Sequence, residues 1–235
     1  AGITNLHTYT KNDYRIYNAD ITEKLYQEAN KNGIKKIILT SSIAAITMNL
    51  FDQDWPVDET NNSLPDDEYG KSKKKQEEIA SEYAEKKLIQ TIAIRPCAFF
   101  EASGIDLGFR LTGSHMIIED VVNAHISAIN VLFDNEKSSK IKMFEAVFTT
   151  NKLPYKNNDK KLIEFNGDMR KIVKKYWPND YKFIATLGFK KTIFSGVYNL
   201  DKSKIILNWS PTFNFDEWIK HCKKNNLNFV EERKL

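Results

Sequence analysis

The sequence predicts an α/β protein built on an open parallel sheet. Two short apolar runs, KKIILTSS (35–42) and LIQTIAIRP (88–96), are rich in aliphatic and β-branched residues and do not alternate with polar ones. This composition is typical of strands that are covered on both faces. Residues with helical spacing precede each run, and the order helix, strand, helix, strand is the one from which parallel sheets are built.

The first helix is predicted over 19–32, where Ile21, Leu25 and Ala29 share a face that we expect to be buried and Gly33 ends the pattern. A second helix is predicted over 67–87, with acidic residues in its first turns and lysines in its last, as the helix dipole favours. The stretch between the first strand and this helix has two prolines and no periodicity. We therefore expect a long functional loop there.

The remaining elements follow in order. After a segment containing three glycines, a third helix is predicted over 117–133 and a further strand over 142–148. The more polar remainder predicts a helix near 160–176, a strand at FIATLGF (183–189) and a last helix at 214–225. We divide the chain into a sheet domain, 1–150, and a smaller α/β domain, 151–235.

Composition excludes several classes. The chain has 235 residues, of which 41% are apolar, and its apolar runs stay well short of the roughly 18 residues that cross a bilayer. No secretory signal precedes the first helix, so we expect a cytoplasmic protein. Cys97 and Cys222 lie far apart and predict neither a disulfide framework nor a metal site. The net charge of +4 is spread among acidic residues, which does not favour nucleic-acid binding.

The candidate chemistry lies at Ser42, Tyr69 and Lys73. A Tyr-x-x-x-Lys spacing places both side chains on one helix face, but it also occurs at Tyr83/Lys87 and Tyr198/Lys202. Only the first pair follows a strand that ends in hydroxyl groups. Ligands of parallel sheets bind beyond the carboxyl ends of the strands, so we expect these three residues to form one site.

These residue types suit proton transfer to a carbon–oxygen centre. The pKa of tyrosine is near 10, and an ammonium about 4 Å away contributes on the order of 4 kcal/mol, enough to lower that pKa by about three units. The Ser42 hydroxyl can orient a substrate oxygen. Because none of these groups carries a hydride, the chemistry requires a redox cofactor.

Six segments resemble, in type and order, the extended short-chain dehydrogenases/reductases, the NAD-dependent epimerase/dehydratase family. They are IILTSSIAAI (37–46), DET (58–60), YGKSKKKQEE (69–78), IAIRP (92–96), HMIIEDVVNAHISAI (115–129) and SGVYNLDKSKIILNWSPTFNFDEWI (195–219). The resemblance covers most of the chain from about Asn18. It implies a partial Rossmann-like sheet with a small C-terminal substrate domain, and NAD or NADP as cofactor.

The resemblance also implies site residues and an activity. The catalytic residues would be Ser42, Tyr69 and Lys73, and the cofactor-binding residues would be Thr40, Ser41, Tyr69, Lys73, Pro96 and Ala98. The activity would be that of an NAD(P)-dependent oxidoreductase, epimerase or dehydratase, acting on a carbonyl or alcohol of a sugar-like or small carbonyl compound. No nucleic-acid or membrane partner is expected, and a homodimer is possible on family grounds alone.

Two departures from the family shape these expectations. The family opens with a strand and a Gly-rich turn that holds the dinucleotide pyrophosphate, and the nine glycines of this chain form no such motif. We expect a fragment of a longer enzyme that by itself binds dinucleotide weakly or not at all; the alternative is an inactive relative with a binding or regulatory role. CAFFEASG (97–104) replaces the residues that contact a nucleotide sugar in the family, which disfavours such a substrate.

Other conspicuous residues are predicted to be structural. We expect His115 and His125 to be packed or capping residues, Asp120 to accept structural hydrogen bonds, and Cys97 to be a spectator. The four tryptophans are expected in the core or at a domain interface. The pairs Tyr83/Lys87 and Tyr198/Lys202 are expected to be coincidental.

Overall fold

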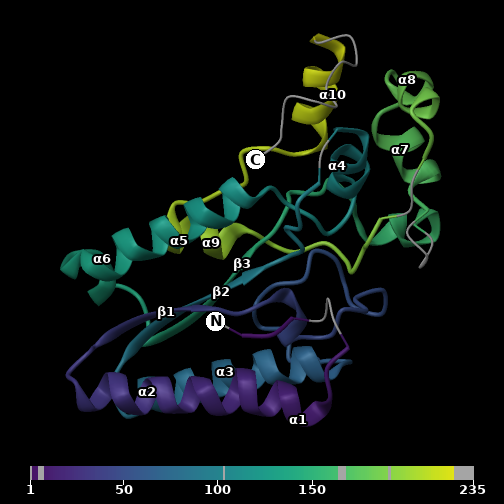
Figure 1. The fold of residues 1–235 in the computed structure, drawn as a ribbon. Coiled ribbons are helices and arrows are strands. Elements are labelled where there is room, and N and C mark those ends of the chain that lie inside the picture. Colours follow the sequence, from purple (N-terminus) through teal and green to yellow (C-terminus); the bar gives the residue numbers. More distant parts are fainter. Residues whose placement is uncertain (1, 5–7, 103, 164–167, 190–191, 225–235) are drawn as a thin grey trace.

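A three-stranded parallel sheet forms the centre of the protein (Figure 1). The computed structural model describes residues 2–4, 8–102, 104–163, 168–189 and 192–224. The strands are β1 (Lys36–Thr40), β2 (Gln90–Pro96) and β3 (Phe144–Thr149), in the order β1-β2-β3. Thr40 pairs with Ile94 and Pro96 pairs with Thr149, so the three carboxyl ends lie at one edge. The α/β class and its three sheet strands are confirmed.

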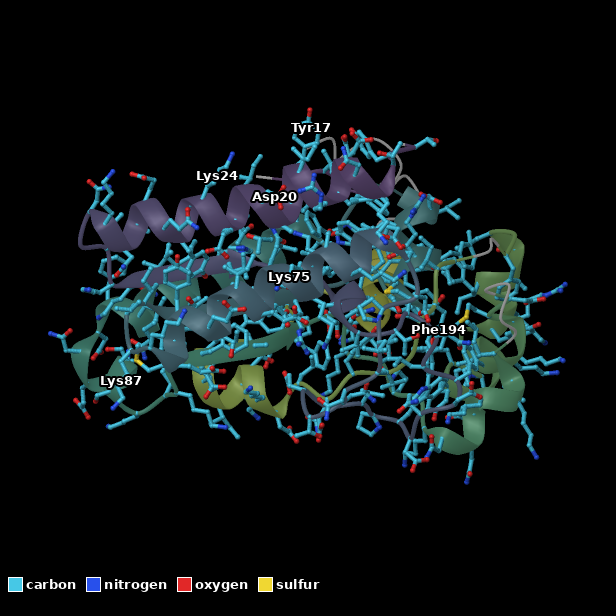
Figure 2. All side chains as sticks on the ribbon, turned by 90° about the horizontal axis from the view of Figure 1, so that it is seen from below. Tyr17, Asp20, Lys24, Lys75, Lys87 and Phe194 are labelled. Atoms are coloured by element: carbon cyan, nitrogen blue, oxygen red, sulfur yellow. The ribbon has the colours of Figure 1, made fainter. Side chains whose placement is uncertain are left out.

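Two helices form a layer on one face of the sheet. Helix α3 (Glu68–Glu85) packs on β2 and β3, and α2 (Ile21–Lys31) lies alongside it. A short helix, α1 (Lys11–Tyr14), and a π-helical segment, η1 (Arg15–Asp20), lead into α2. Figure 2 looks onto this layer, where Lys24 of α2 and Lys75 of α3 are exposed.

The buried face of α2 differs from the prediction. Ile21 and Leu25 are exposed, whereas Thr22, Tyr26 and Ala29 are buried. Tyr26 is the residue that fixes this rotation, because its ring packs against Tyr83 and its hydroxyl lies 3.0 Å from the Thr91 hydroxyl. Burying an aromatic ring and satisfying its hydroxyl together outweigh the burial of two aliphatic side chains. Ile21 and Leu25 instead line a groove beside β1.

Helices α5 (Ile118–Phe133) and α9 (Asp201–Leu207) cover the other face, and α6 (Asn135–Ser139) follows α5 (Figure 1). The inner side of α5 buries small and aliphatic residues against the sheet, as the periodicity predicts. Its outer side is also apolar, with exposed Ile118, Val122, Ile126, Ile129 and Phe133. Among the described residues, no helix is both long and apolar enough to cross a membrane.

The remaining regular elements of the described chain are helical. It comprises α4 (Gly104–Leu111), the 3₁₀ segment η3 (Asn157–Leu162), α7 (Arg170–Tyr176), α8 (Tyr181–Thr186) and α10 (Phe215–Lys224). The strand predicted at 183–189 is wrong, because Tyr181, Ile184 and Leu187 recur every three residues and face the core from one side of α8. The helix predicted near 160–176 is divided into η3 and α7; residues 164–167 lie outside the described part.

One hydrophobic core joins the sheet to these helices. Ile92 and Ile94 of β2 belong to the same buried cluster as Trp177 and Trp218. All four tryptophans are at most 8% exposed, which confirms that they are core residues. Both cysteines are buried free thiols, and the described residues contain no cluster of three or more potential metal ligands. The division at residue 150 stays a prediction.

Candidate active site

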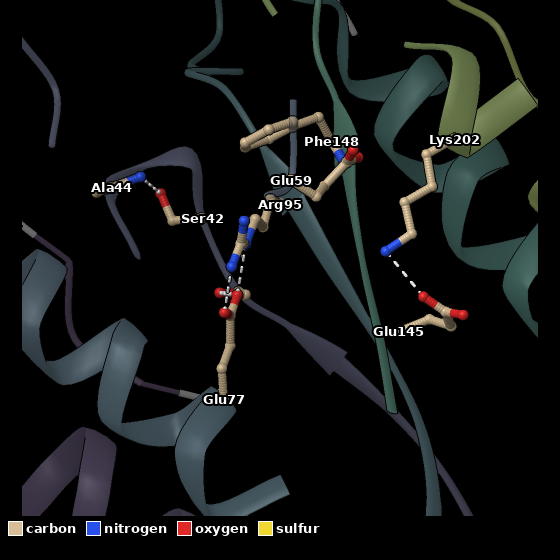
Figure 3. Close-up of polar contacts among 9 residues, drawn as sticks. Ser42, Ala44, Glu59, Glu77, Arg95, Glu145, Phe148 and Lys202 are labelled. Carbon is tan, nitrogen blue, oxygen red and sulfur yellow. Dashed lines mark hydrogen bonds and ion pairs between the residues drawn. The ribbon is translucent and has the colours of Figure 1, made fainter. Parts of the chain in front are cut away.

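The turn after β1 positions Ser42. The Ser41 amide donates to the Ile94 carbonyl at 2.7 Å, which keeps the chain on the sheet for one residue beyond β1. Ser42 then caps a short 3₁₀ turn, η2 (Ile43–Ala45), where its Oγ accepts a hydrogen bond of 3.1 Å from the Ala44 amide (Figure 3). The hydroxyl is therefore fixed at the carboxyl end of β1.

Gly70 brings the helix with Tyr69 and Lys73 against that turn. Asp67 caps α3 by accepting from the Gly70 amide at 2.6 Å. A Cβ added at Gly70 would lie 2.3 Å from the Ala44 carbonyl oxygen and 2.8 Å from the Pro65 Cβ. Only glycine allows this approach without displacing backbone. Gly70 is not among the predicted site residues.

The residues predicted for catalysis and cofactor binding lie on one groove. Its volume is about 670 Å³, and it opens at the carboxyl ends of β1 and β2. All the predicted residues line it: Thr40, Ser41, Ser42, Tyr69, Lys73, Pro96 and Ala98. The chain thus brings together side chains from two strand ends and one helix, as expected for a ligand site of a parallel sheet.

Lys73 is a buried cation. Its Nζ donates a hydrogen bond of 2.9 Å to the Thr40 carbonyl and lies 5.7 Å from the centroid of the Tyr69 ring. Burial lowers the pKa of Lys73 to about 8, although the nearby Glu77 carboxylate acts in the opposite direction. Lys73 is therefore still mainly an ammonium at neutral pH.

Tyr69 does not have the lowered pKa that we expected. Burial raises the pKa of its phenol above the usual 10, and the Asp67 carboxylate and Tyr14 act in the same direction. A side-chain hydrogen bond with Ser42 lowers the pKa but does not outweigh burial. The expectation failed because it counted the attraction of an ammonium but not the loss of water around the phenolate. In this state Tyr69 is a protonated acid at neutral pH.

A buried ion pair joins α3 to β2, the two elements that carry groove residues Tyr69, Lys73 and Pro96. The Arg95 guanidinium donates to both carboxylate oxygens of Glu77, at 2.8 and 2.6 Å (Figure 3). Ser41 Oγ donates to the same carboxylate at 2.5 Å. The Arg95 guanidinium also lies 5.3 Å from the Phe148 ring centroid. This pair was not predicted. The sequence feature that could have indicated it is Arg95 itself, an arginine within an otherwise apolar strand, because a buried charge requires a partner.

Asn18 ties α3 to the preceding helical segment. The Asn18 amide donates to Ser72 Oγ at 2.9 Å, and Ser72 donates to the Tyr69 carbonyl at 2.6 Å. One turn later, Gln76 donates to Thr22 Oγ1 at 2.7 Å. This polar contact between two helices was not predicted, since it depends on the π-helical turn at Arg15–Asp20.

The predicted structural residues behave as expected. Asp120 is fully buried and accepts from the Thr212 amide and hydroxyl, at 3.0 and 2.7 Å. His125 lies between the Val121 carbonyl and the Thr40 hydroxyl, at 2.8 and 2.9 Å. Burial raises the pKa of the Cys97 thiol to about 12, so it stays an unreactive thiol at neutral pH.

The other two Tyr/Lys pairs lie outside the groove. Tyr83 donates to Glu23 at 3.4 Å, and Lys87 has a left-handed backbone conformation, φ 56°, just after α3. Tyr198 is buried, and Lys202 forms an ion pair of 2.8 Å with Glu145 (Figure 3). The prediction that these pairs are structural is confirmed.

His115 lies in a different environment from His125. It is 3% exposed and lines a second cavity of about 250 Å³, whose walls are mostly apolar. Burial lowers the pKa of His115 to about 4, and the Arg110 charge acts in the same direction. The imidazole is therefore neutral at physiological pH.

Comparison with known proteins identifies related sequences. Residues 1–104 match the sequence profile of the 3-beta hydroxysteroid dehydrogenase/isomerase family. A curated UDP-glucose 4-epimerase of Rhizobium leguminosarum bv. trifolii is 22% identical over 248 residues, covering 87% of this chain and 69% of that protein.

Solved structures show the same fold. The UDP-glucuronic acid 4-epimerase of Bacillus cereus in complex with NAD has a TM-score of 0.61 at 16% identity, covering 93% of this chain and 70% of that one. The glucuronic acid dehydrogenase of Chromohalobacter salexigens has a TM-score of 0.58 at 18% identity, covering 95% of this chain; the chain spans 63% of that enzyme. The predicted resemblance to the extended short-chain dehydrogenases/reductases is confirmed, by sequence in residues 1–104 and by fold over most of the chain.

Proposed function

We propose that this chain is the catalytic part of an NAD(P)-dependent enzyme that reduces, oxidises or epimerises a carbon–oxygen centre of a small molecule. The observation that carries the proposal is the convergence of Ser42, Tyr69 and Lys73 on one groove at the carboxyl ends of β1 and β2. The names of the related proteins, epimerases and dehydrogenases, support the same reaction class.

The residues of the groove fit the nicotinamide end of the cofactor. Among the described residues, the Lys73 ammonium has the Thr40 carbonyl as its hydrogen-bond acceptor, which leaves N–H donors for the hydroxyls of a ribose. Pro96 and Ala98 continue the same wall beyond β2. When bound, the nicotinamide supplies the hydride chemistry that no side chain provides.

The side chains of the groove hold and move the proton. In carbonyl reduction, the protonated Tyr69 phenol donates its proton to the substrate oxygen, which the Ser42 hydroxyl holds by a hydrogen bond. The Lys73 ammonium stabilises the phenolate that forms. A raised phenol pKa is suited to this direction, because the group carries its proton before the reaction begins.

Substitution of Tyr69 tests the proposal. The assay uses the protein joined to a Gly-rich dinucleotide-binding segment ahead of residue 1, and it measures NADH or NADPH turnover with carbonyl substrates. Tyr69→Phe is expected to lower kcat by a factor of about 100 or more, with cofactor affinity nearly unchanged. Tyr83→Phe, on the same helix but outside the groove, is the control. Near-normal turnover by Tyr69→Phe overturns the assignment.

The inactive relative remains the second candidate. It is favoured if the unsubstituted protein binds cofactor but turns over no carbonyl compound. A cytoplasmic homodimer is also part of our proposal, on the basis of the family resemblance. Analytical ultracentrifugation tests the oligomeric state, and a monomer at micromolar concentration contradicts it.

A further inference from the structure

A second cavity adjoins the catalytic groove. Its volume is about 250 Å³, and it shares Phe99, Phe100 and Ile118 as walls with the groove that contains Tyr69. The rest of its lining is largely apolar, with Leu107, Met116 and Ile117 among the contributors. A molecule that reacts at Tyr69 can therefore extend across the shared wall into an apolar space.

Two polar groups face this space without a protein partner. Neither ring nitrogen of His115 has a hydrogen-bond partner among the described residues, although the residue is only 3% exposed. The Glu119 side chain lines the same cavity, and its Oε2 is buried with no hydrogen-bond partner in the described chain. Buried polar atoms are normally paired, so the unpaired Glu119 Oε2, beside an imidazole that has no side-chain hydrogen bond and lines the same cavity, indicates a ligand that supplies the partners.

The backbone holds His115 in this position. The Met116 amide donates to the Ala98 carbonyl at 2.9 Å, and residues 98 and 115 form an isolated parallel bridge. The His115 ring lies 6.5 Å from the Phe100 ring, between centroids. A neutral imidazole offers one donor and one acceptor, so His115 can both donate a hydrogen bond to a ligand in this cavity and accept one from it.

The charges of the two cavities disfavour a nucleoside diphosphate. Lys73 is the only cation among the described residues that line them, whereas Glu101 and Glu119 contribute carboxylates. The nearby arginines already have acidic partners: Arg95 binds Glu77, and Arg110 binds Asp106 at 2.7 Å. A diphosphate is normally held by several cationic or amide donors, and carboxylates repel it.

We infer that this second cavity selects the substrate, and that it takes a compact, uncharged carbonyl compound whose mainly apolar body carries a hydroxyl group bound by His115 and Glu119. The inference rests on the function proposed above for the groove. It narrows the substrate to a class that is not nucleotide-linked. His115 then determines specificity and is not a proton carrier in the reaction.

Binding of three probes to the 235-residue chain tests the inference by isothermal titration calorimetry or ligand-observed NMR. The probes are 4′-hydroxyacetophenone, acetophenone and uridine diphosphate. The hydroxylated ketone is expected to bind at least about tenfold more tightly than uridine diphosphate. His115→Leu is expected to weaken the hydroxylated ketone about tenfold, which corresponds to about 1.4 kcal/mol, and acetophenone by less than about threefold.

Matched variants separate this role from a structural one. His115→Gln keeps a donor and an acceptor and should recover most of the affinity, whereas Glu119→Gln keeps the side-chain shape and should weaken only the hydroxylated ketone. His221→Gln, on α10 outside both cavities, should change nothing. Thermal unfolding of each variant establishes that it is folded.

Three results overturn the inference. They are equal losses for both ketones in His115→Leu, tighter binding of uridine diphosphate than of either ketone, and no binding of either ketone to the unsubstituted chain. These measurements require no turnover. A normal rate for Tyr69→Phe would therefore contradict the proposed function without affecting the binding results. Conversely, failure of the binding predictions would contradict this inference without affecting the role proposed for Tyr69.

Discussion

Arg95 of β2 and Glu77 of α3 form a bidentate ion pair, with N–O distances of 2.8 and 2.6 Å, beneath the helix that carries Tyr69 and Lys73. Both side chains are about nine-tenths buried, at 10% and 8% exposure. The pair fixes the second turn of α3 after Tyr69 to the strand that forms the other wall of the groove. The relative positions of Tyr69 and Pro96 thus depend on this contact.

Removal of Arg95 should destabilise the fold strongly. Arg95→Leu leaves the Glu77 carboxylate buried with Ser41 as its remaining side-chain donor, and we expect a loss of about 3–5 kcal/mol in the free energy of unfolding. Urea denaturation measures this loss. The double variant Arg95→Leu with Glu77→Gln removes the uncompensated charge and should recover most of it. A loss below about 1 kcal/mol in the single variant would contradict a buried, compensated pair.

Lys73 should lower the stability of the unliganded chain. Its pKa falls from 10.5 to about 8 on folding, so the folded state binds fewer protons than the unfolded state between these values. The stability contribution is complete above pH 10.5, is lost as the pH falls to about 8, and stays lost below. At about 1.36 kcal/mol per pH unit the loss is on the order of 3 kcal/mol.

Replacement of Lys73 checks this sign. Lys73→Met should raise the free energy of unfolding at pH 7 by about 2 kcal/mol, after allowance for the lost hydrogen bond to Thr40. The difference from wild type should shrink as the pH rises from 8 to 10.5. Lys75→Met, an exposed lysine of the same helix, should change stability by less than about 0.5 kcal/mol. Destabilisation by Lys73→Met at pH 7 would show that the buried cation is compensated.

His115 should make the fold sensitive to acid. Its pKa is lowered from 6.5 to about 4 in the folded state, so its contribution is complete above pH 6.5 and is lost progressively as the pH falls to about 4. At about 1.36 kcal/mol per pH unit the change is on the order of 3 kcal/mol. His115→Gln should flatten the pH dependence of unfolding in this window, and His221→Gln should not. Identical slopes for wild type and His115→Gln would contradict the lowered pKa.

The Asp120 carboxylate connects α5 to the segment before α10, and its removal should destabilise the fold. Its carboxylate accepts two hydrogen bonds from Thr212 and a third, of 3.4 Å, from the Phe213 amide. Asp120→Ala leaves these buried donors without a partner, and we expect a loss of about 2–4 kcal/mol by urea denaturation. Asp120→Asn retains one acceptor oxygen and should lose less. Equal losses would indicate that the second oxygen carries the contact.

Strands β1 and β2 could be predicted because each is a short apolar run rich in β-branched residues that follows a predicted helix. The grouping of Ser42, Tyr69 and Lys73 was also accessible, since parallel topology places strand ends together. The face of α2 that is buried could not be predicted, because it is determined by contacts of Tyr26 with Thr91 and Tyr83, which are far away in the sequence. The strand predicted at 183–189 failed for a related reason, because a short apolar run fits a helix as well as a strand.

The direction of the Tyr69 pKa shift could not be predicted from the sequence for a different reason. Spacing indicates which charges are near, but the sign of a shift depends on how much water the fold removes. The lone His115 and Glu119 could not be recognised from sequence either, because an unmatched polar atom is defined only when the walls around it are known.

The contact at Gly70 also determines how the protein can be redesigned. Any side chain at Gly70 would collide with the Ala44 carbonyl. Mutant libraries that aim to accept bulkier reactants therefore gain nothing from substitutions at Gly70. Diversity belongs on the opposite side, at Phe99, Phe100 and Ile118, where apolar side chains and not backbone set the available width.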